Sequence, residues 1–210
     1  SFAFAAEFAL FGKNPSGFHF TSILIHILNL IFVYLLVLKI TKRVGVASLV
    51  TAFWALHPAA TEAVSWVANQ SSLIFLSFFI LTVLAILKYG DNRNKRFFIW
   101  ISYLFFTLSL LTKETALGGI FIIPFVFLLI SRIKESAPQL HGGLRIFGIN
   151  KILTDSIPFV LIGLAYFYAH YKIIGALGDH ALRGSFSQNL LLAPAVFYKY
   201  IILTFYPVNV

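Results

Sequence analysis

The feature that most constrains this chain is the uncharged, largely apolar run Phe18–Leu38, which is long enough to cross a bilayer as one helix. A helix rises 1.5 Å per residue, so roughly 20 apolar residues span the hydrocarbon core. Six further apolar runs follow, all of them shorter. The expected spans lie near residues 18–38, 44–56, 71–87, 97–111, 116–130, 157–174 and 190–206. We therefore expect an all-α integral membrane protein, a bundle of about seven transmembrane helices.

The composition supports this expectation and excludes several classes of protein. Hydrophobic residues make up 60% of the chain, and only 11% of the residues are charged. A soluble domain needs roughly a quarter of its residues charged, so a soluble enzyme, a disordered segment and a nucleic-acid-binding module are excluded. There are no cysteines, which excludes a disulfide framework, a thiol nucleophile and a Cys-ligated metal.

Basic residues cluster in turns between the apolar runs, and this pattern predicts the orientation. The three clusters are Lys39, Lys42 and Arg43; Lys88, Arg93, Lys95 and Arg96; and Arg132, Lys134, Arg145 and Lys151. Seven alternating spans place all three on one side of the membrane, which the positive-inside rule identifies as cytoplasmic. The polar linker 131–154 is then a cytoplasmic loop, as its Pro138 and Gly142-Gly143 also indicate.

The ends of the chain indicate a fragment. The sequence has no Met, begins within an apolar stretch and stops just after Pro207. We expect residues 1–210 to form a single, partial multi-span membrane domain that is truncated at both ends. A longer protein would supply the remaining segments.

On the predicted outer face, the sequence His57-Pro58-Ala59-Ala60-Thr61-Glu62-Ala63-Val64-Ser65-Trp66 ends one span and begins a short helix. Pro58 suits a first helical turn, and the carboxylate of Glu62 is favoured near the positive end of a helix. Helical spacing places Glu62, Ser65, Trp66 and Asn69 on one face. Such an amphipathic helix is either an interfacial anchor held by Trp66 or part of a polar site.

The second unusual outer segment is Thr112-Lys113-Glu114-Thr115, between two apolar runs with almost no turn residues. Charges at the membrane boundary are costly, so they usually pair with each other or serve a function. One interpretation is a self-contained Lys113–Glu114 pair at a tight helical corner. In the other, Lys113 binds an anionic group such as a lipid-linked phosphate, and Glu114 orients a polar partner.

The remaining polar candidates favour structural roles. His19 and His26 share a face of the first span with Ser22 and Asn29, a stripe that is more typical of helix packing than of a metal site. No metal is expected. Arg183, with Asp179 and His180, lies in the last outer loop, where it contacts either substrate or solvent.

The order of these motifs resembles a known family. Phe11-Gly12-Lys13-Asn14-Pro15-Ser16-Gly17-Phe18-His19 is followed by Phe53-Trp54-Ala55-Leu56-His57-Pro58, by Thr61-Glu62-Ala63-Val64-Ser65-Trp66-Val67, and by Leu108-Ser109-Leu110-Leu111-Thr112-Lys113-Glu114-Thr115-Ala116. This order is similar to the membrane domain of the tetratricopeptide-repeat-containing O-mannosyltransferases and their prokaryotic relatives. These enzymes are glycosyltransferases of the GT-C class. The resemblance covers residues 1 to about 130.

The resemblance implies an enzyme that uses a polyprenyl-phosphate-linked sugar on the outer or lumenal side of a membrane. It also implies an acidic catalytic base in the first outer loop, and this residue is expected to precede Ser1. Glu7 stands where the family tends to carry an amide, and Ser22 where it often has Asn. Asn69-Gln70-Ser71-Ser72 replaces a stretch that usually carries Arg and an acid.

We therefore expect a membrane glycosyltransferase that moves a mannose-like sugar to a hydroxyl acceptor on a protein or glycan. Lys113 is the candidate for the donor phosphate, with Glu114, His57, Glu62, Trp66 and Arg183 as further substrate-binding candidates. No cofactor is firmly implied, and no nucleic acid is expected as a partner. The membrane would be a bacterial or archaeal plasma membrane, or the endoplasmic reticulum. A transporter or flippase for an amphiphile, and a non-catalytic scaffold, are the alternatives.

Overall fold

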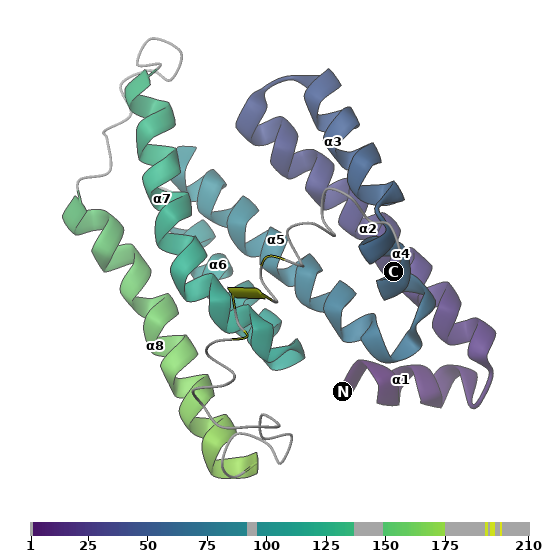
Figure 1. The fold of residues 1–210 in the computed structure, drawn as a ribbon. Helices are drawn as coiled ribbons and strands as arrows, with labels where there is room; N and C mark the ends of the chain where they lie inside the picture. The colour runs from purple at the N-terminus through teal and green to yellow at the C-terminus, as the bar shows by residue number, and fades with distance from the viewer. Residues whose placement is uncertain are drawn as a thin grey trace. The chain divides into compact units, whose positions relative to one another are not determined.

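The computed structural model describes residues 2–91, 96–136 and 149–174, together with Leu192, Pro194, Ala195 and Tyr198. The elements within these residues are all helices (Figure 1). They are α1 (Phe2–Phe11), α2 (Pro15–Thr41), α3 (Val44–Leu56), α4 (Pro58–Ser65), η1 (Val67–Asn69), α5 (Gln70–Asp91), α6 (Phe97–Thr112), η2 (Glu114–Gly118), α7 (Gly119–Ser136) and α8 (Ile149–Ile174). The prediction of an all-α membrane bundle is confirmed.

Four helical segments are long and apolar enough to cross a membrane: Pro15–Thr41, Gln70–Asp91, Glu114–Ser131 and Asn150–Ile173. α3 and α6 are shorter apolar helices. Each of the first six expected runs therefore falls on a helix, whereas the run 190–206 lies almost wholly outside the described residues. The polar linker expected at 131–154 is shorter in the structure, because α7 continues to Ser136 and α8 already begins at Ile149.

The chain divides into two compact units, residues 1–164 and 165–210. The described part of the second unit is mainly the end of α8. There the ring of Tyr166 lies 5.8 Å from that of His170, and the Lys172 ammonium lies 5.8 Å from the centre of the Tyr168 ring. Aromatic and basic side chains of this kind are typical of a membrane–water boundary.

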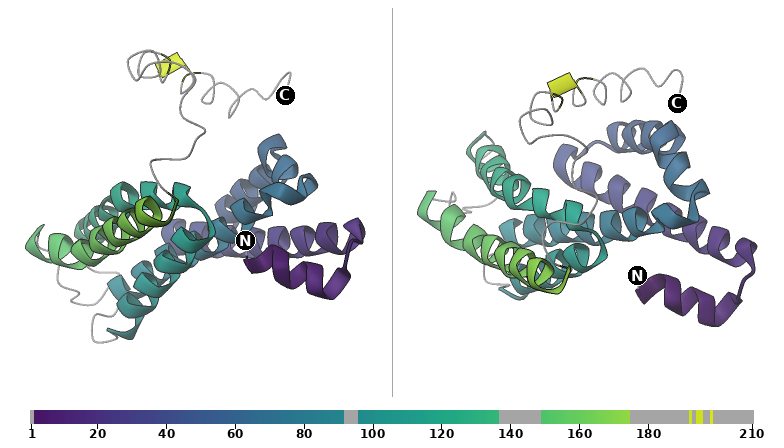
Figure 2. Two further views of the ribbon diagram at one scale, coloured as in Figure 1. Left: turned by 90° about the horizontal axis from the view of Figure 1, so that it is seen from below. Right: turned by 60° about the horizontal axis from the view of Figure 1, so that its bottom comes forward.

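Within the first unit, α5 is the helix around which the others pack. It contacts α2, α6 and α7, and Figure 2 gives two further views of these helices. A second core forms where Phe159 of α8 meets the rings of Tyr103, Phe106 and Phe127 at centroid distances of 4.7, 5.4 and 6.5 Å. α2 and α3 expose many of their large apolar side chains, as helices in contact with lipid do.

One end of this unit carries the basic turns, and two ion pairs lie there. Lys39 at the end of α2 pairs with Asp91 at the end of α5, and Lys151 pairs with Asp155 within α8. Asp155 is buried; its carboxylate accepts a hydrogen bond from the Tyr89 hydroxyl at 3.2 Å, and its backbone carbonyl accepts one from Tyr103 at 3.2 Å. Asp91 thus joins the ends of α2 and α5, and Asp155 joins α8 to α5 and α6 through the hydroxyls of Tyr89 and Tyr103.

Candidate functional site

Lys113 lies at the sharp corner between α6 and η2. It has an extended backbone (φ −155°, ψ 133°) and its N–H donates to the Ser109 carbonyl at 3.1 Å, which ends α6. Its ammonium crosses to α5 and donates to the Ser72 hydroxyl at 2.5 Å, and Ser72 in turn donates to the Asn69 side-chain oxygen. The ammonium is thus fixed against the first turn of another helix.

Gly119 allows this corner to pack closely. A Cβ atom at Gly119 would lie 2.7 Å from the Phe79 ring of α5 and 2.8 Å from the Phe106 ring of α6. No real Cβ approaches other atoms so closely, so a side chain here would push the start of α7 away from both helices. The short η2 segment and Gly119 together hold Lys113 near α5.

A second charged group meets the same turn of α5. Glu7 of α1 is 6% exposed and Gln70 is 3% exposed, and the Gln70 amide donates to Glu7 Oε1 at 2.5 Å. The other carboxylate oxygen, Oε2, is buried without a hydrogen-bond partner among the described residues. Leaving part of a buried carboxylate unsatisfied is costly, so this arrangement calls for a reason beyond packing.

These side chains form what we call the α5 N-terminal cluster: Glu7, Asn69, Gln70, Ser72 and Lys113. The stretch Asn69–Ser72, which replaces the Arg and acid expected from the resemblance, supplies neutral partners to both charges. The amino end of a helix also carries partial positive charge and favours anions. Sequence reasoning identified Lys113 but missed the pairing of Glu7 with Gln70. An acid within the apolar α1 segment was the available signal.

His57 and Trp66 frame the short outer helix α4. His57 is extended and ends α3; it is half-buried, and its ring lies 6.0 Å from that of Phe53. Pro58 begins α4 as predicted, but the helix does not continue through Asn69. Trp66 is extended, is 61% exposed and is followed by the 3-10 turn η1, so Trp66 and Asn69 do not share one helical face with Ser65.

Two acidic candidates lie on these segments. Glu62 lies within α4, and its side chain is outside what the structure describes. Glu114 is the first residue of η2 and is exposed. The backbone therefore places Glu62 on the helix between His57 and the α5 N-terminal cluster, and Glu114 directly beside Lys113.

Part of the polar stripe on α2 packs against neighbouring helices, as predicted. The Asn29 amide donates to the Leu73 carbonyl at 2.9 Å, and the Ser77 hydroxyl donates to Asn29 Oδ1 at 2.7 Å. The His26 ring lies 5.3 Å from the Trp54 ring, whereas His19 is exposed. Among the described residues, no three His, Cys, Asp or Glu side chains gather as a metal site would require.

Comparison with known proteins identifies the family. Residues 1–151 match the model of the dolichyl-phosphate-mannose-protein mannosyltransferase family. The chain belongs to this family. It is therefore a multi-pass integral membrane protein of the mannosyltransferase family, and the resemblance inferred from the motifs is confirmed.

Two curated relatives are described as protein O-mannosyl-transferases. Protein O-mannosyl-transferase TMTC1 of Mus musculus is 27% identical over 125 residues, which are 55% of this chain and 13% of that protein. The protein of the same name from Homo sapiens is 27% identical over 124 residues, covering 54% of this chain and 14% of its own length. The chain thus spans about a seventh of these relatives. No solved structure matches significantly.

The mannosyltransferase family match covers the α5 N-terminal cluster and most of the other candidates. Glu7, His57, Glu62, Trp66, Lys113 and Glu114 all lie within residues 1–151. Arg183 lies beyond the matched region and also outside the described residues. The structure thus brings Lys113 together with Ser72 and Asn69, and it brings Glu7 together with Gln70.

Proposed function

We propose that this chain is part of a membrane glycosyltransferase that moves a mannose-like sugar from a polyprenyl-phosphate donor to a hydroxyl acceptor. Membership of the dolichyl-phosphate-mannose-protein mannosyltransferase family supports this proposal, as do the relatives described as protein O-mannosyl-transferases. The reaction would take place on the side of the membrane opposite the basic turns, because the α5 N-terminal cluster lies at that end.

The observation that carries the proposal is the anchored ammonium of Lys113. Its hydrogen bond to Ser72 uses one of three N–H donors. The others can meet an anion beside the amino end of α5, where the helix dipole also favours negative charge. A fixed cation at this position suits a phosphate that gains charge as it leaves, because preorganised donors stabilise such charge without reorganising.

In the proposed reaction, the acceptor oxygen attacks the anomeric carbon and the bond from that carbon to the phosphate oxygen breaks. The polyprenyl phosphate leaves with the electron pair and is stabilised by Lys113, while a base takes the acceptor proton. His57 and Glu62 would line the sugar and acceptor, Trp66 would stack on a sugar ring, and Glu114 and Arg183 would orient polar groups of the substrate.

The test is sugar transfer in membranes that contain the full-length protein. Radiolabelled polyprenyl-phosphate sugars are supplied as donors to the wild type and to Lys113→Ala, Glu62→Gln and Lys88→Ala. Lys88 is an exposed cation at the other end of the bundle, over the Phe98 ring, and serves as the matched control. Transfer should be lost in the first two variants and kept in the third. Folded wild-type protein that transfers no sugar from any donor would overturn the proposal in favour of a transporter or scaffold.

A further inference from the structure

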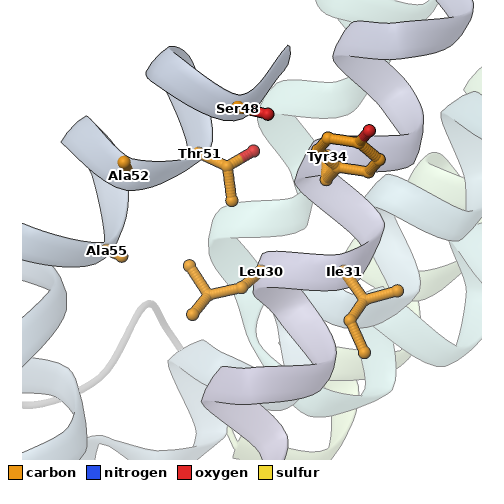
Figure 3. Close-up of a pocket in the computed structure, with 7 residues that line it drawn as sticks. All are labelled: Leu30, Ile31, Tyr34, Ser48, Thr51, Ala52 and Ala55. Carbon is orange, nitrogen blue, oxygen red and sulfur yellow. The ribbon is translucent and has the colours of Figure 1, made fainter. Parts of the chain in front are cut away.

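A groove of about 370 Å³ runs between α2 and α3 (Figure 3), and none of its lining residues belongs to the α5 N-terminal cluster. One wall is Leu30, Ile31 and Tyr34 of α2. The other wall is Ser48, Thr51, Ala52 and Ala55 of α3. The lining is almost entirely apolar, and the groove is open along one side. Because α2 has the length and composition of a membrane span, the groove lies at membrane depth.

The groove exists because α3 presents small side chains to α2. Positions 48, 51, 52 and 55 follow the spacing that places residues on one face of a helix, and they are occupied by Ser, Thr and Ala. Figure 3 shows Ala52 and Ala55 with little bulk opposite Leu30, while Thr51 faces the Tyr34 ring. The Thr51 hydroxyl is buried and has no hydrogen-bond partner among the described residues.

The end of the groove nearest the α2–α3 turn leads to exposed positive charge. Tyr34 and Ser48 are five residues from Lys39 and Arg43 respectively, or about 7.5 Å along each helix. Lys39 is engaged by Asp91, whereas Lys42 and Arg43 are exposed on the turn itself. Lys42 adopts a left-handed conformation (φ 58°), which ends α2 and lets α3 return alongside it.

The spacing between groove and charge matches the layers of one bilayer leaflet. The headgroup layer is roughly 5–7 Å thick on each side of the hydrocarbon core. A headgroup at Lys42 and Arg43 would therefore place its glycerol esters near the Tyr34 and Ser48 hydroxyls, and an acyl chain along Leu30, Ala52 and Ala55. A basic site beside a groove between helices is the pattern that recognises anionic headgroups.

From this match we infer that the α2–α3 groove binds an anionic phospholipid of the leaflet on the side of the basic turns. The acyl chain fills the groove, and the phosphate is held by Lys42 and Arg43. A lipid chain in this position replaces contacts that the small α3 side chains cannot make with α2. The inference rests on the groove and the turn, so it does not depend on the proposed transferase activity.

The test measures lipid binding to full-length, delipidated protein through thermal stability. Phosphatidylglycerol and phosphatidylcholine with identical acyl chains are titrated, and the apparent affinity is taken from the rise in Tm. The wild type should bind phosphatidylglycerol more tightly. Lys42→Gln/Arg43→Gln should lower that affinity about ten- to thirtyfold and abolish the preference, the scale expected for two basic residues on one headgroup. The exposed Lys13→Gln is the charge control.

The groove itself is tested by filling it. Ala52→Leu/Ala55→Leu should weaken binding of both lipids, while Val50→Leu, which adds bulk on α3 outside the groove, should not. Equal affinity of the wild type for the two lipids would overturn the inference. So would an unchanged affinity for phosphatidylglycerol in both Lys42→Gln/Arg43→Gln and Ala52→Leu/Ala55→Leu. A third contrary result is stronger displacement of bound phosphatidylglycerol by polyprenyl phosphate than by phosphatidylglycerol, which would assign the groove to the donor lipid.

Discussion

The two ends of the α2–α5–α6 bundle differ in the partners of their charged side chains. At the end with the basic turns, Asp91 is paired with Lys39, and Asp155 is paired with Lys151 and accepts from Tyr89. At the other end, Glu7 is held by the neutral amide of Gln70 and Lys113 by the neutral hydroxyl of Ser72. At the first end, the acids are paired with basic side chains of the same protein. At the second end, Glu7 and Lys113 have only neutral partners among the described residues, so their charges remain available to a ligand.

This difference has an energetic consequence. A buried or half-buried charge with a neutral partner retains much of its desolvation cost, which an ion pair offsets in part. Such an arrangement lowers stability unless a ligand completes it. We therefore expect substitutions at the basic-turn end to change mainly stability, and substitutions in the α5 N-terminal cluster to change mainly sugar transfer.

The largest effect is expected from a comparison of two lysines. Lys113→Ala should lower sugar transfer by about 100-fold or more, the usual cost of removing one donor to developing charge, with little change in Tm. Lys151→Ala should leave transfer per folded molecule within about twofold. Both are measured as initial rates normalised to folded protein. Equal losses of activity in the two variants would show that the ends do not differ in role.

Glu7→Gln tests the second charged side chain of the α5 N-terminal cluster. The variant keeps a side chain of the same shape and removes a buried charge with one neutral partner, so Tm should be unchanged or higher. Transfer should nevertheless fall about tenfold if the carboxylate serves a ligand, a loss of about 1.4 kcal/mol in the transition state. Leu10→Gln, on the exposed face of α1, is the control. A fall in Tm without loss of transfer would make Glu7 purely structural.

At the other end, Asp155→Ala should destabilise the protein by about 1–2 kcal/mol. The substitution removes the acceptor of Tyr89 and Lys151, and hydrogen bonds within membrane bundles are individually modest. Thermal unfolding in detergent measures the change, with Thr154→Ala as the exposed neighbour. Loss of transfer from fully folded Asp155→Ala protein would contradict the assignment of this end to stability.

The smallest effect is expected for the pair of Lys39 and Asp91. Their side chains are 31% and 42% exposed, so solvent screens the attraction and a double-mutant cycle should give less than about 0.5 kcal/mol. The coupling should decrease further at high salt. A coupling above about 1.5 kcal/mol would mean that the pair is less screened than its exposure indicates.

Hydropathy was sufficient to predict α2, α3, α5, α6, α7 and α8, because apolar length alone identifies a membrane span, but it did not predict α1. The corner at Thr112–Thr115 was predicted from its lack of turn residues. The contact of Glu7 with Gln70 was not predictable, since it joins residues 63 positions apart through tertiary packing. The break at Trp66 was also missed, because a helical periodicity continues across it. The α2–α3 groove depends on the absence of bulk at Ala52 and Ala55, which no motif marks.

The connection between α6 and η2 is a single residue, Lys113. α6 ends at Thr112 and the η2 turn begins at Glu114, so Lys113 is the whole connection. One inserted residue before Lys113 would rotate its side chain by about 100° relative to α6 if the helix simply extended, and the ammonium would turn away from Ser72. We therefore expect the fold to tolerate a change of side chain at this corner better than a change of length, because a deletion or insertion here would change the register of Lys113 against Ser72.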